Sequence, residues 1–277
     1  MARQTITDDV RLWIAAQFEA GIHDDDILAT LLRSGWEDEV ARQAMDLARA
    51  EPLNPTWAPG GLPEPDLSSG TCELVIDQHR ITVMASMQLP RVVVLGGLLT
   101  DGECDALIEQ ARPRLSRSET VDVATGGSEV NAARTSDGMF FGRAETPLIE
   151  RIERRLAKLL RWPVERGEGL QVLHYRPGAE YKPHHDWFDP GRPGSGPVLA
   201  RGGQRVATVV MYLNTPAAGG ATVFPDAGLD VAAVKGNAVF FAYERPSADT
   251  RTLHGGAPVR AGEKWVATKW LRERRFD

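Results

Sequence analysis

The chain has 277 residues, of which 42% are hydrophobic and 25% are charged, a composition typical of a protein with a packed core. This length allows one large domain and a smaller companion. The two cysteines, Cys72 and Cys104, are too few for a disulfide scaffold or a thiolate zinc site, and they favour a reducing compartment. We find no signal peptide and no run of about 20 apolar residues, so we expect a cytoplasmic protein without a membrane partner.

The first fifty residues are acidic, with ten Asp or Glu residues against five arginines, and the rest of the chain is nearly neutral. Neither part has the basic excess typical of nucleic-acid binding, so we expect no nucleic-acid partner. The segment predicts three short helices: one over 10–18 capped by Thr7, one starting at Asp24–Asp26, and one from about Trp36. This small three-helix domain, 1–52, loosely resembles ubiquitin-associated-like bundles, which suggests a protein-interaction module. The alternative is a solubilising or packing appendage.

Residues 53–70 are rich in proline and glycine and predict a linker, which leaves 71–277 as the main domain. Its first part predicts a hairpin around Asp77–His79, a buried strand over 92–99 and a helix capped by Asp101. A polar loop at about 114–133 and a strongly amphipathic helix from Thr146 follow. From about residue 168 short strands alternate with Gly/Pro turns, a pattern typical of a jelly-roll or barrel.

One of these strands carries the sequence Pro183-His184-His185-Asp186. Since side chains alternate across a strand, His184 and Asp186 share a face and His185 points away. Among the other histidines, His254 in a later strand is the best candidate for a third ligand. Two histidines and one carboxylate form the facial triad of non-haem Fe(II) oxygenases. Zinc is the alternative metal, but its site would need a partner acid or base that we do not find.

A lysine in an apolar strand supports the same chemistry. Lys264 lies ten residues after His254 in the sequence GEKWVATKW, where an unpaired ammonium group is costly to bury. Near a metal it can pair with the distal carboxylate of a dicarboxylate co-substrate. The alternative is a lysine that extends to solvent at the strand end. Counting by two from 264 puts Lys269 on the opposite face.

These residues, in this order, resemble the prolyl 4-hydroxylase branch of the Fe(II)/2-oxoglutarate dioxygenases. The resemblance covers about residues 90–273, and its strongest blocks are RTSDGMF (134–140), GEGLQVLHYRPGAEYKPHHDWF (167–188), RVATVVMYLNTPAAGGATVFP (205–225), KGNAVFFAY (235–243) and LHGGAPVRAGEKWVATKW (253–270). It implies an α+β fold, with a double-stranded β-helix (jelly-roll) core and supporting helices beside the small N-terminal helical bundle.

Carried over by position, the resemblance implies that His184, Asp186 and His254 bind iron and that Lys264 binds the C5 carboxylate of 2-oxoglutarate. It further implies a co-substrate pocket lined by Tyr175, with the inward-facing Thr208, Val210 and Tyr212 of one strand beside it. Arg134 matches an arginine on the substrate side, although an exposed loop charge is the alternative. Trp187, also on the substrate side, stands where the family often has tyrosine, a change expected to alter the pocket wall. The loop 189–203 is long, rich in Gly and Pro, and divergent from the family, and we expect it to cover the substrate entrance.

The resemblance implies an Fe(II)- and 2-oxoglutarate-dependent hydroxylase that uses O₂, with ascorbate as reductant, and forms succinate and CO₂. The expected substrate is a prolyl residue in a peptide or protein, bound as an extended proline-containing chain. Hydroxylation of a free amino acid or another small molecule is a second possibility, and it predicts a closed pocket. A non-catalytic jelly-roll binding module is the alternative from a different class.

Overall fold

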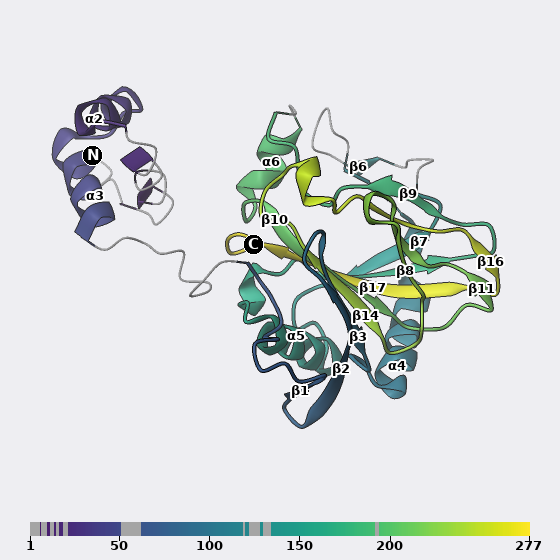
Figure 1. Cartoon of the computed structure of the whole chain (residues 1–277). Coiled ribbons are helices and arrows are strands. Elements are labelled where there is room, and N and C mark those ends of the chain that lie inside the picture. Colours follow the sequence, from purple (N-terminus) through teal and green to yellow (C-terminus); the bar gives the residue numbers. More distant parts are fainter. Residues whose placement is uncertain are drawn as a thin grey trace. The chain divides into compact units, whose positions relative to one another are not determined.

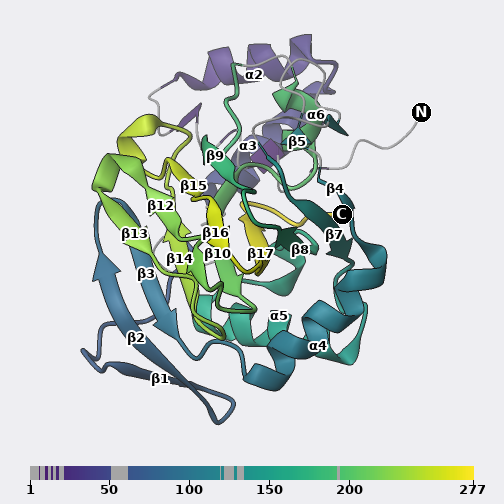
Figure 2. The ribbon, with the colours of Figure 1, turned by 90° about the vertical axis from the view of Figure 1, so that its right-hand side faces the viewer.

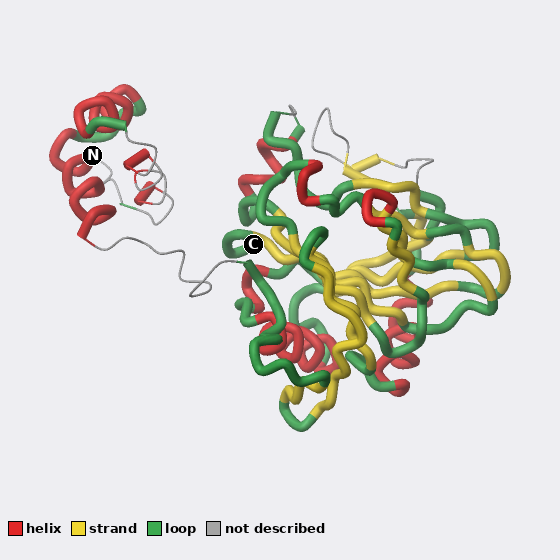
Figure 3. Tube along the Cα trace, viewed as in Figure 1, coloured by secondary structure: helices red, strands yellow, loops and turns green. Residues whose placement is uncertain are grey.

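The computed structural model divides the chain into two compact units, Met1–Gly61 and Leu62–Asp277 (Figure 1). It describes residues 6, 10–11, 14, 17–18, 22–50, 62–118, 120–121, 128–129, 134–191 and 194–277. The described part of the first unit is helical, whereas strands form the middle of the second (Figure 3).

Two helices of the N-terminal unit, α2 (Asp24–Arg33) and α3 (Asp38–Ala50), lie where the sequence predicts them. Aspartates occupy the first turn of α2, where the helix dipole favours negative charge. Gly35 follows α2 with a φ of 90°, a left-handed conformation that glycine adopts without strain. The first predicted helix and its cap Thr7 lie largely outside the described residues. Its described residue Ile14 shares one buried cluster with side chains of α2 and α3: Ile27, Leu28, Leu31, Ala41, Ala44, Met45 and Ala48.

Two antiparallel sheets form the framework of the second unit (Figure 2). Within the described residues the larger sheet has nine strands in the order β1-β2-β3-β14-β10-β17-β8-β7-β4, and a smaller sheet has four in the order β13-β12-β15-β9. This agrees with the predicted jelly-roll core. The strands of the larger sheet are β1 (Glu73–Ile76), β2 (His79–Met87), β3 (Arg91–Gly96), β4 (Ser116–Arg117), β7 (Asp137–Phe141), β8 (Leu170–Tyr175), β10 (Arg205–Tyr212), β14 (Ala238–Ala242) and β17 (Lys264–Arg272).

Shorter elements complete the unit. The smaller sheet consists of β9 (Tyr181–His184), β12 (Thr222–Phe224), β13 (Leu229–Val231) and β15 (His254–Gly256). Two further pairs are β5 (Thr120–Val121) with β6 (Ser128–Glu129), and β11 (Ala218–Gly219) with β16 (Val259–Ala261). A short helix, α6 (Ser195–Ala200), lies within the loop 189–203.

Two helices, α4 (Asp101–Ala111) and α5 (Pro147–Leu160), lie against the side of the larger sheet that faces away from the smaller one (Figures 1 and 2). Because side chains alternate along a strand, β17 presents one set of residues to the helices and the other to the opposite face of the sheet. Lys269 contacts Glu153 of α5, whereas Lys264, Val266 and Thr268 line a pocket on the opposite face. The opposite-face prediction for the two lysines is therefore confirmed.

The local predictions for this unit are largely confirmed. The hairpin β1–β2 turns at Asp77 and Gln78, both with positive φ. The helix predicted from Thr146 is α5, and Thr146 is its N-cap. The prediction that Asp101 caps α4 is wrong, because the cap is Thr100. Its hydroxyl accepts from the Glu103 N–H at 3.2 Å, and the Glu103 carboxylate accepts from the Thr100 N–H at 3.0 Å. This reciprocal capping box satisfies two helix-end donors at once.

The second unit begins at Leu62, whereas the sequence predicts a linker through residue 70. Pro63 and Pro65 are buried, and the Glu64 N–H donates to the Leu160 carbonyl at 3.0 Å. The Glu64 carboxylate also pairs with Arg91. These contacts fix the chain at the end of α5 before the hairpin begins.

Cys72 and Cys104 are both free. Among the residues that the structure describes, we find no helix with the length and apolar character needed to cross a membrane.

The ion pair between Glu153 and Lys269 tests how α5 is attached to the sheet. Both residues are 2% exposed, and Lys269 also donates to the Glu168 carbonyl. Glu153→Ala leaves an uncompensated buried ammonium group, so we expect the free energy of unfolding to fall by about 3–5 kcal/mol in chemical denaturation. Glu150→Ala is the matched control, because it breaks an exposed pair with Arg154 on the same helix and should cost less than about 1 kcal/mol. Equal losses in the two variants would contradict this assignment.

Candidate active site

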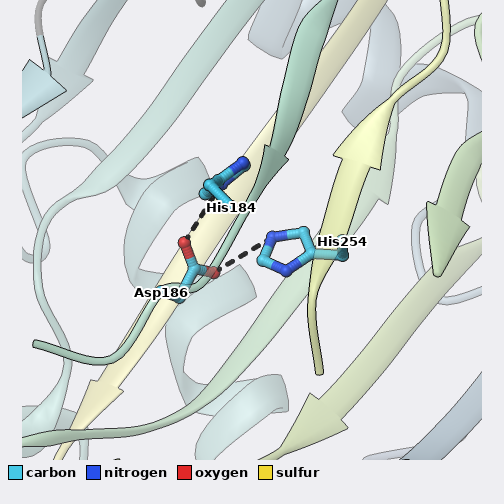
Figure 4. Close-up of side chains that lie close together, drawn as sticks. All are labelled: His184, Asp186 and His254. Carbon is cyan, nitrogen blue, oxygen red and sulfur yellow. Dashed lines mark ion pairs between the residues drawn. The ribbon is translucent and has the colours of Figure 1, made fainter. Parts of the chain in front are cut away.

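The three predicted ligands converge where β9 and β15 pair. The strands are antiparallel neighbours with His184 opposite His254, and the two imidazole centroids lie 4.4 Å apart. Asp186 follows two residues after the end of β9. Its carboxylate oxygens each lie 3.5 Å from one imidazole, Oδ1 from Nε2 of His184 and Oδ2 from Nε2 of His254 (Figure 4). One ligand atom from each residue lies within 4.8 Å of the others, a spacing that a single metal ion can bridge.

Backbone hydrogen bonds orient both imidazole rings. Nδ1 of His184 lies 2.9 Å from the Lys182 carbonyl, and Nδ1 of His254 lies 2.9 Å from the Thr252 carbonyl. A carbonyl only accepts, so each Nδ1 donates a proton to it, and Nε2 is the nitrogen that faces the other ligands. Burial also lowers the pKa of His254 to about 4, which keeps this imidazole neutral and able to bind a metal at neutral pH.

The Asp186 carboxylate remains ionised although it is buried. Burial by itself raises its pKa, but the positive charge that His254 and His184 carry when they are protonated outweighs that effect, and the pKa lies well below the usual aspartate value. The Thr208 hydroxyl donates to Oδ2 at 2.7 Å. The site therefore combines one carboxylate with two imidazole nitrogens, a donor set that suits a divalent transition metal.

His185 and Trp187 lie outside this group. Their rings stack on each other with centroids 4.6 Å apart, and neither residue lines the pocket beside the three ligands. The expected orientation of His185 away from the metal face agrees with this position. Trp187 packs instead against the hydrophobic core of the unit, so the pocket-wall position expected for it is not observed.

A pocket beside the three side chains contains Lys264, which is 3% exposed. Within the described part of the chain its ammonium group has no hydrogen bond or ion pair, and its nearest aromatic rings are those of Tyr175 and Tyr212, at 5.5 and 5.9 Å. Burial lowers the pKa of Lys264 to about 8. The pocket is lined by Arg134, Leu173, Tyr175, Tyr181, His184, Asp186, Thr208, Val210, Thr222, His254, Gly255, Gly256, Lys264, Val266, Thr268 and Trp270.

Most of the other predicted residues reach this pocket. Tyr175, Thr208 and Val210 line it, whereas Tyr212 lies behind it, fully buried, with its hydroxyl donating to Thr222 at 2.9 Å. Arg134 also lines it and is 5% exposed, so the alternative of an exposed loop charge is wrong. Its guanidinium donates to Gln171 at 2.7 Å and lies 4.9 Å from the Tyr181 ring centroid.

Sequence reasoning missed two kinds of pocket residue. Val266, Thr268 and Trp270 share the face of Lys264, and counting by two along β17 would have identified them. Tyr181 stacks on His184 with ring centroids 3.7 Å apart. Its position depends on the pairing of β9 with β15, for which the sequence contains no local signal.

Comparison with known proteins identifies the family. Residues 170–272, which include all three ligands and Lys264, match the 2OG-Fe(II) oxygenase superfamily. Prolyl 4-hydroxylase 5 of Arabidopsis thaliana is 42% identical over 209 residues, covering 68% of this chain and 70% of the relative. Prolyl 4-hydroxylase 1 of the same plant is 44% identical over 203 residues, covering 67% and 70%. The chain belongs to the prolyl 4-hydroxylase family of 2OG-Fe(II) oxygenases.

A solved structure supports this membership. The viral collagen prolyl hydroxylase of Paramecium Bursaria Chlorella virus-1, crystallised as a 2OG complex, is 29% identical to the chain with a TM-score of 0.50. The alignment covers 65% of this chain and 95% of the viral one. The predicted family is confirmed, and the protein is a 2-oxoglutarate-dependent dioxygenase.

The geometry predicts which histidine of the His184-His185 pair is needed for metal binding. We expect His184→Ala or Asp186→Ala to weaken Mn(II) binding by more than about 100-fold, because loss of a direct ligand should exceed the usual cost of losing an outer contact. His185→Ala, the adjacent control, should stay within about threefold of the wild type, well below that cost. Calorimetric titration of the metal-free protein measures all three. Loss of binding in His185→Ala with retention in His184→Ala would reverse the assignment.

Proposed function

We propose that the protein hydroxylates prolyl residues in a peptide or protein, with Fe(II) held by His184, Asp186 and His254 and 2-oxoglutarate held by Lys264. The observation that carries the proposal is a buried ammonium group that has no counter-ion among the described residues, in the same pocket as three convergent metal-ligating side chains. The three metal-ligating side chains leave positions on a bound cation open, and the buried ammonium group needs an anion. One anion long enough to reach from the cation to the lysine meets both needs.

The ligand set supports iron. Two imidazoles and one carboxylate occupy only three positions of an octahedral ion, and the other three are left for a bidentate oxo-acid and O₂. The two Nδ1–carbonyl bonds fix the imidazole orientations before a metal arrives, which reduces the cost of ordering them on binding.

Lys264 supports a dicarboxylate co-substrate. Burying a charged group without a partner costs free energy. Folding has already removed the water from the Lys264 ammonium group, so this cost does not recur when an anion binds to it. Near Nζ, the Tyr175 ring lines the pocket with apolar surface and the Tyr212 ring lies behind it, so a carboxylate is the fitting partner for the ammonium group. The proposal assigns Tyr175 and Thr208 to the walls around the co-substrate, and Tyr212 to the layer behind them.

When bound, iron and 2-oxoglutarate supply the oxidising chemistry, with release of succinate and CO₂. The chain supplies binding, orientation and exclusion of water. His254, Asp186 and Lys264 are all nearly fully buried, so charges in the pocket interact in a medium of low dielectric constant. Ascorbate is proposed as the reductant that keeps the iron ferrous.

The substrate proposal rests on the named relatives, which are prolyl 4-hydroxylases. The pocket adds support, because Trp270 and Arg134 offer an aromatic surface and a cation beside the metal ligands. An aromatic surface suits a proline ring, and aromatic-lined grooves commonly bind extended proline-containing chains. The loop 189–203 is proposed to border the entrance.

The protonation state of Lys264 makes co-substrate binding dependent on pH. The pKa of about 8 lies below the usual lysine value, so the ammonium group loses its proton, and with it the attraction for a carboxylate, as the pH rises above 8. We expect the 2-oxoglutarate dissociation constant of the Mn(II)-loaded protein to rise by up to about tenfold per pH unit above 8. Binding should be insensitive to pH just below that value.

Two variants control this measurement. Lys264→Arg keeps its charge throughout and should show a flat profile over the same range. Lys182→Ala removes an exposed lysine of β9 and should retain the slope of the wild type. A flat profile in the wild type would place the anchor for 2-oxoglutarate elsewhere.

Turnover tests the substrate class. With Fe(II), ascorbate, O₂ and 2-oxoglutarate, a proline-containing peptide should gain 16 Da on proline, and one 2-oxoglutarate should be converted to succinate and CO₂ per hydroxylation, as detected by mass spectrometry. Free proline and other amino acids are the parallel substrates. Hydroxylation of these alone would favour the small-molecule alternative. Absence of succinate and of bound iron would leave the binding module as the explanation.

A further inference from the structure

A buried line of hydroxyl groups connects the larger sheet to Asp186. The Thr208 hydroxyl of β10 donates to Oδ2 of Asp186 at 2.7 Å, and the Tyr243 hydroxyl lies 3.0 Å from the Thr208 oxygen. Thr208 is 0% exposed, Tyr243 2% and Asp186 6%. Water therefore does not replace a missing contact easily at any of the three groups.

Counting protons fixes the direction of both bonds. A threonine hydroxyl carries one proton, and an ionised carboxylate only accepts, so the Thr208 proton points to Asp186. Tyr243 must then donate to the remaining lone pairs of Thr208. Burial, with the nearby Asp186 charge adding to it, raises the pKa of Tyr243 well above its usual value, so the phenol keeps the proton that it donates. The bonds run from Tyr243 to Thr208 to Asp186, and such a chain polarises each member.

Asp186 needs this support more than the two histidines do. Each imidazole is fixed by a bond from Nδ1 to a carbonyl of its own segment, whereas Asp186 lies beyond the end of β9 in no regular strand. A threonine hydroxyl can rotate unless a neighbour selects one direction. The Tyr243 backbone is itself fixed, since its N–H donates to the Val206 carbonyl at 3.0 Å at the start of β10.

We propose that Tyr243 is a positioning residue for the metal site, which orients the Thr208 hydroxyl so that Thr208 holds the Asp186 carboxylate in place for the ion. The proposal rests on the proposed function, in which Asp186 is a metal ligand. Tyr243 does not line the pocket, so it acts through Thr208 and touches neither substrate nor co-substrate.

Metal binding by four proteins tests the relay without any turnover: the wild type, Thr208→Val, Tyr243→Phe and the double variant. Calorimetric titration of each metal-free protein with Mn(II) gives its dissociation constant. Thr208→Val should weaken binding by about 10–100-fold, the usual cost of losing an outer contact to a ligand. Tyr243→Phe should weaken it by a smaller factor of about 3–10. The double variant should bind no more weakly than Thr208→Val, because Tyr243 has nothing left to act through.

Two controls separate the relay from general loosening of the core. Thr208→Ser retains the hydroxyl and should bind Mn(II) within about threefold of the wild type, below the cost of a lost outer contact. Ser136→Ala deletes a fully buried hydroxyl that donates only to Ser118, and its affinity should be unchanged. Losses that add in the double variant, or full affinity in Tyr243→Phe, would overturn the relay while leaving the metal site in place. Failure of the wild type to bind Mn(II) would instead overturn the proposed function, and the relay with it.

Discussion

The pairing of β9 with β15 is the constraint on which the site depends. It sets His184 opposite His254 although 70 positions separate them in sequence, and it turns the chain so that Asp186 follows at the strand end. The close approach of the two strands requires glycine at position 255, where an added Cβ would lie 2.8 Å from the Tyr181 carbonyl oxygen. A side chain there would force the strands apart and separate the two imidazoles.

The two buried lysines of β17 have different roles, one structural and one functional. Lys269 and Lys264 both lie in β17 and are almost fully buried, yet only Lys269 has a carboxylate partner within the described residues. Glu153 stabilises Lys269 and attaches α5 to the sheet. Lys264 retains the cost of its burial until an anion arrives, and this cost appears as its lowered pKa. An energetic penalty that the fold leaves uncompensated is a common mark of a binding site.

The proposed metal ligands are supported in two different ways. The histidines receive support from their own backbone segments, so their geometry follows once β9 and β15 have formed. Asp186 is held by the Thr208 hydroxyl of the larger sheet, with Tyr243 behind it just past the end of β14, so its geometry follows only when the two sheets have come together. The three ligands therefore depend on both sheets of the jelly-roll. A change in how the two sheets pack would displace Asp186 more than either histidine. The interaction role suggested for the N-terminal unit stays a prediction.

Periodicity in the sequence determined the local geometry: the helices α2, α3 and α5, the early hairpin, the shared face of His184 and Asp186, and the opposite faces of Lys264 and Lys269. It did so because alternation within a strand or helix is a property of neighbouring residues. The cap of α4 was missed by one position, because Thr100 and Asp101 are both good capping residues. Only the tertiary structure decided four other features: the stacking of Tyr181, the burial of Arg134, the position of Trp187 outside the pocket, and the link from Tyr243 to Asp186. These contacts join segments far apart in the chain, and their geometry depends on how the sheets pack.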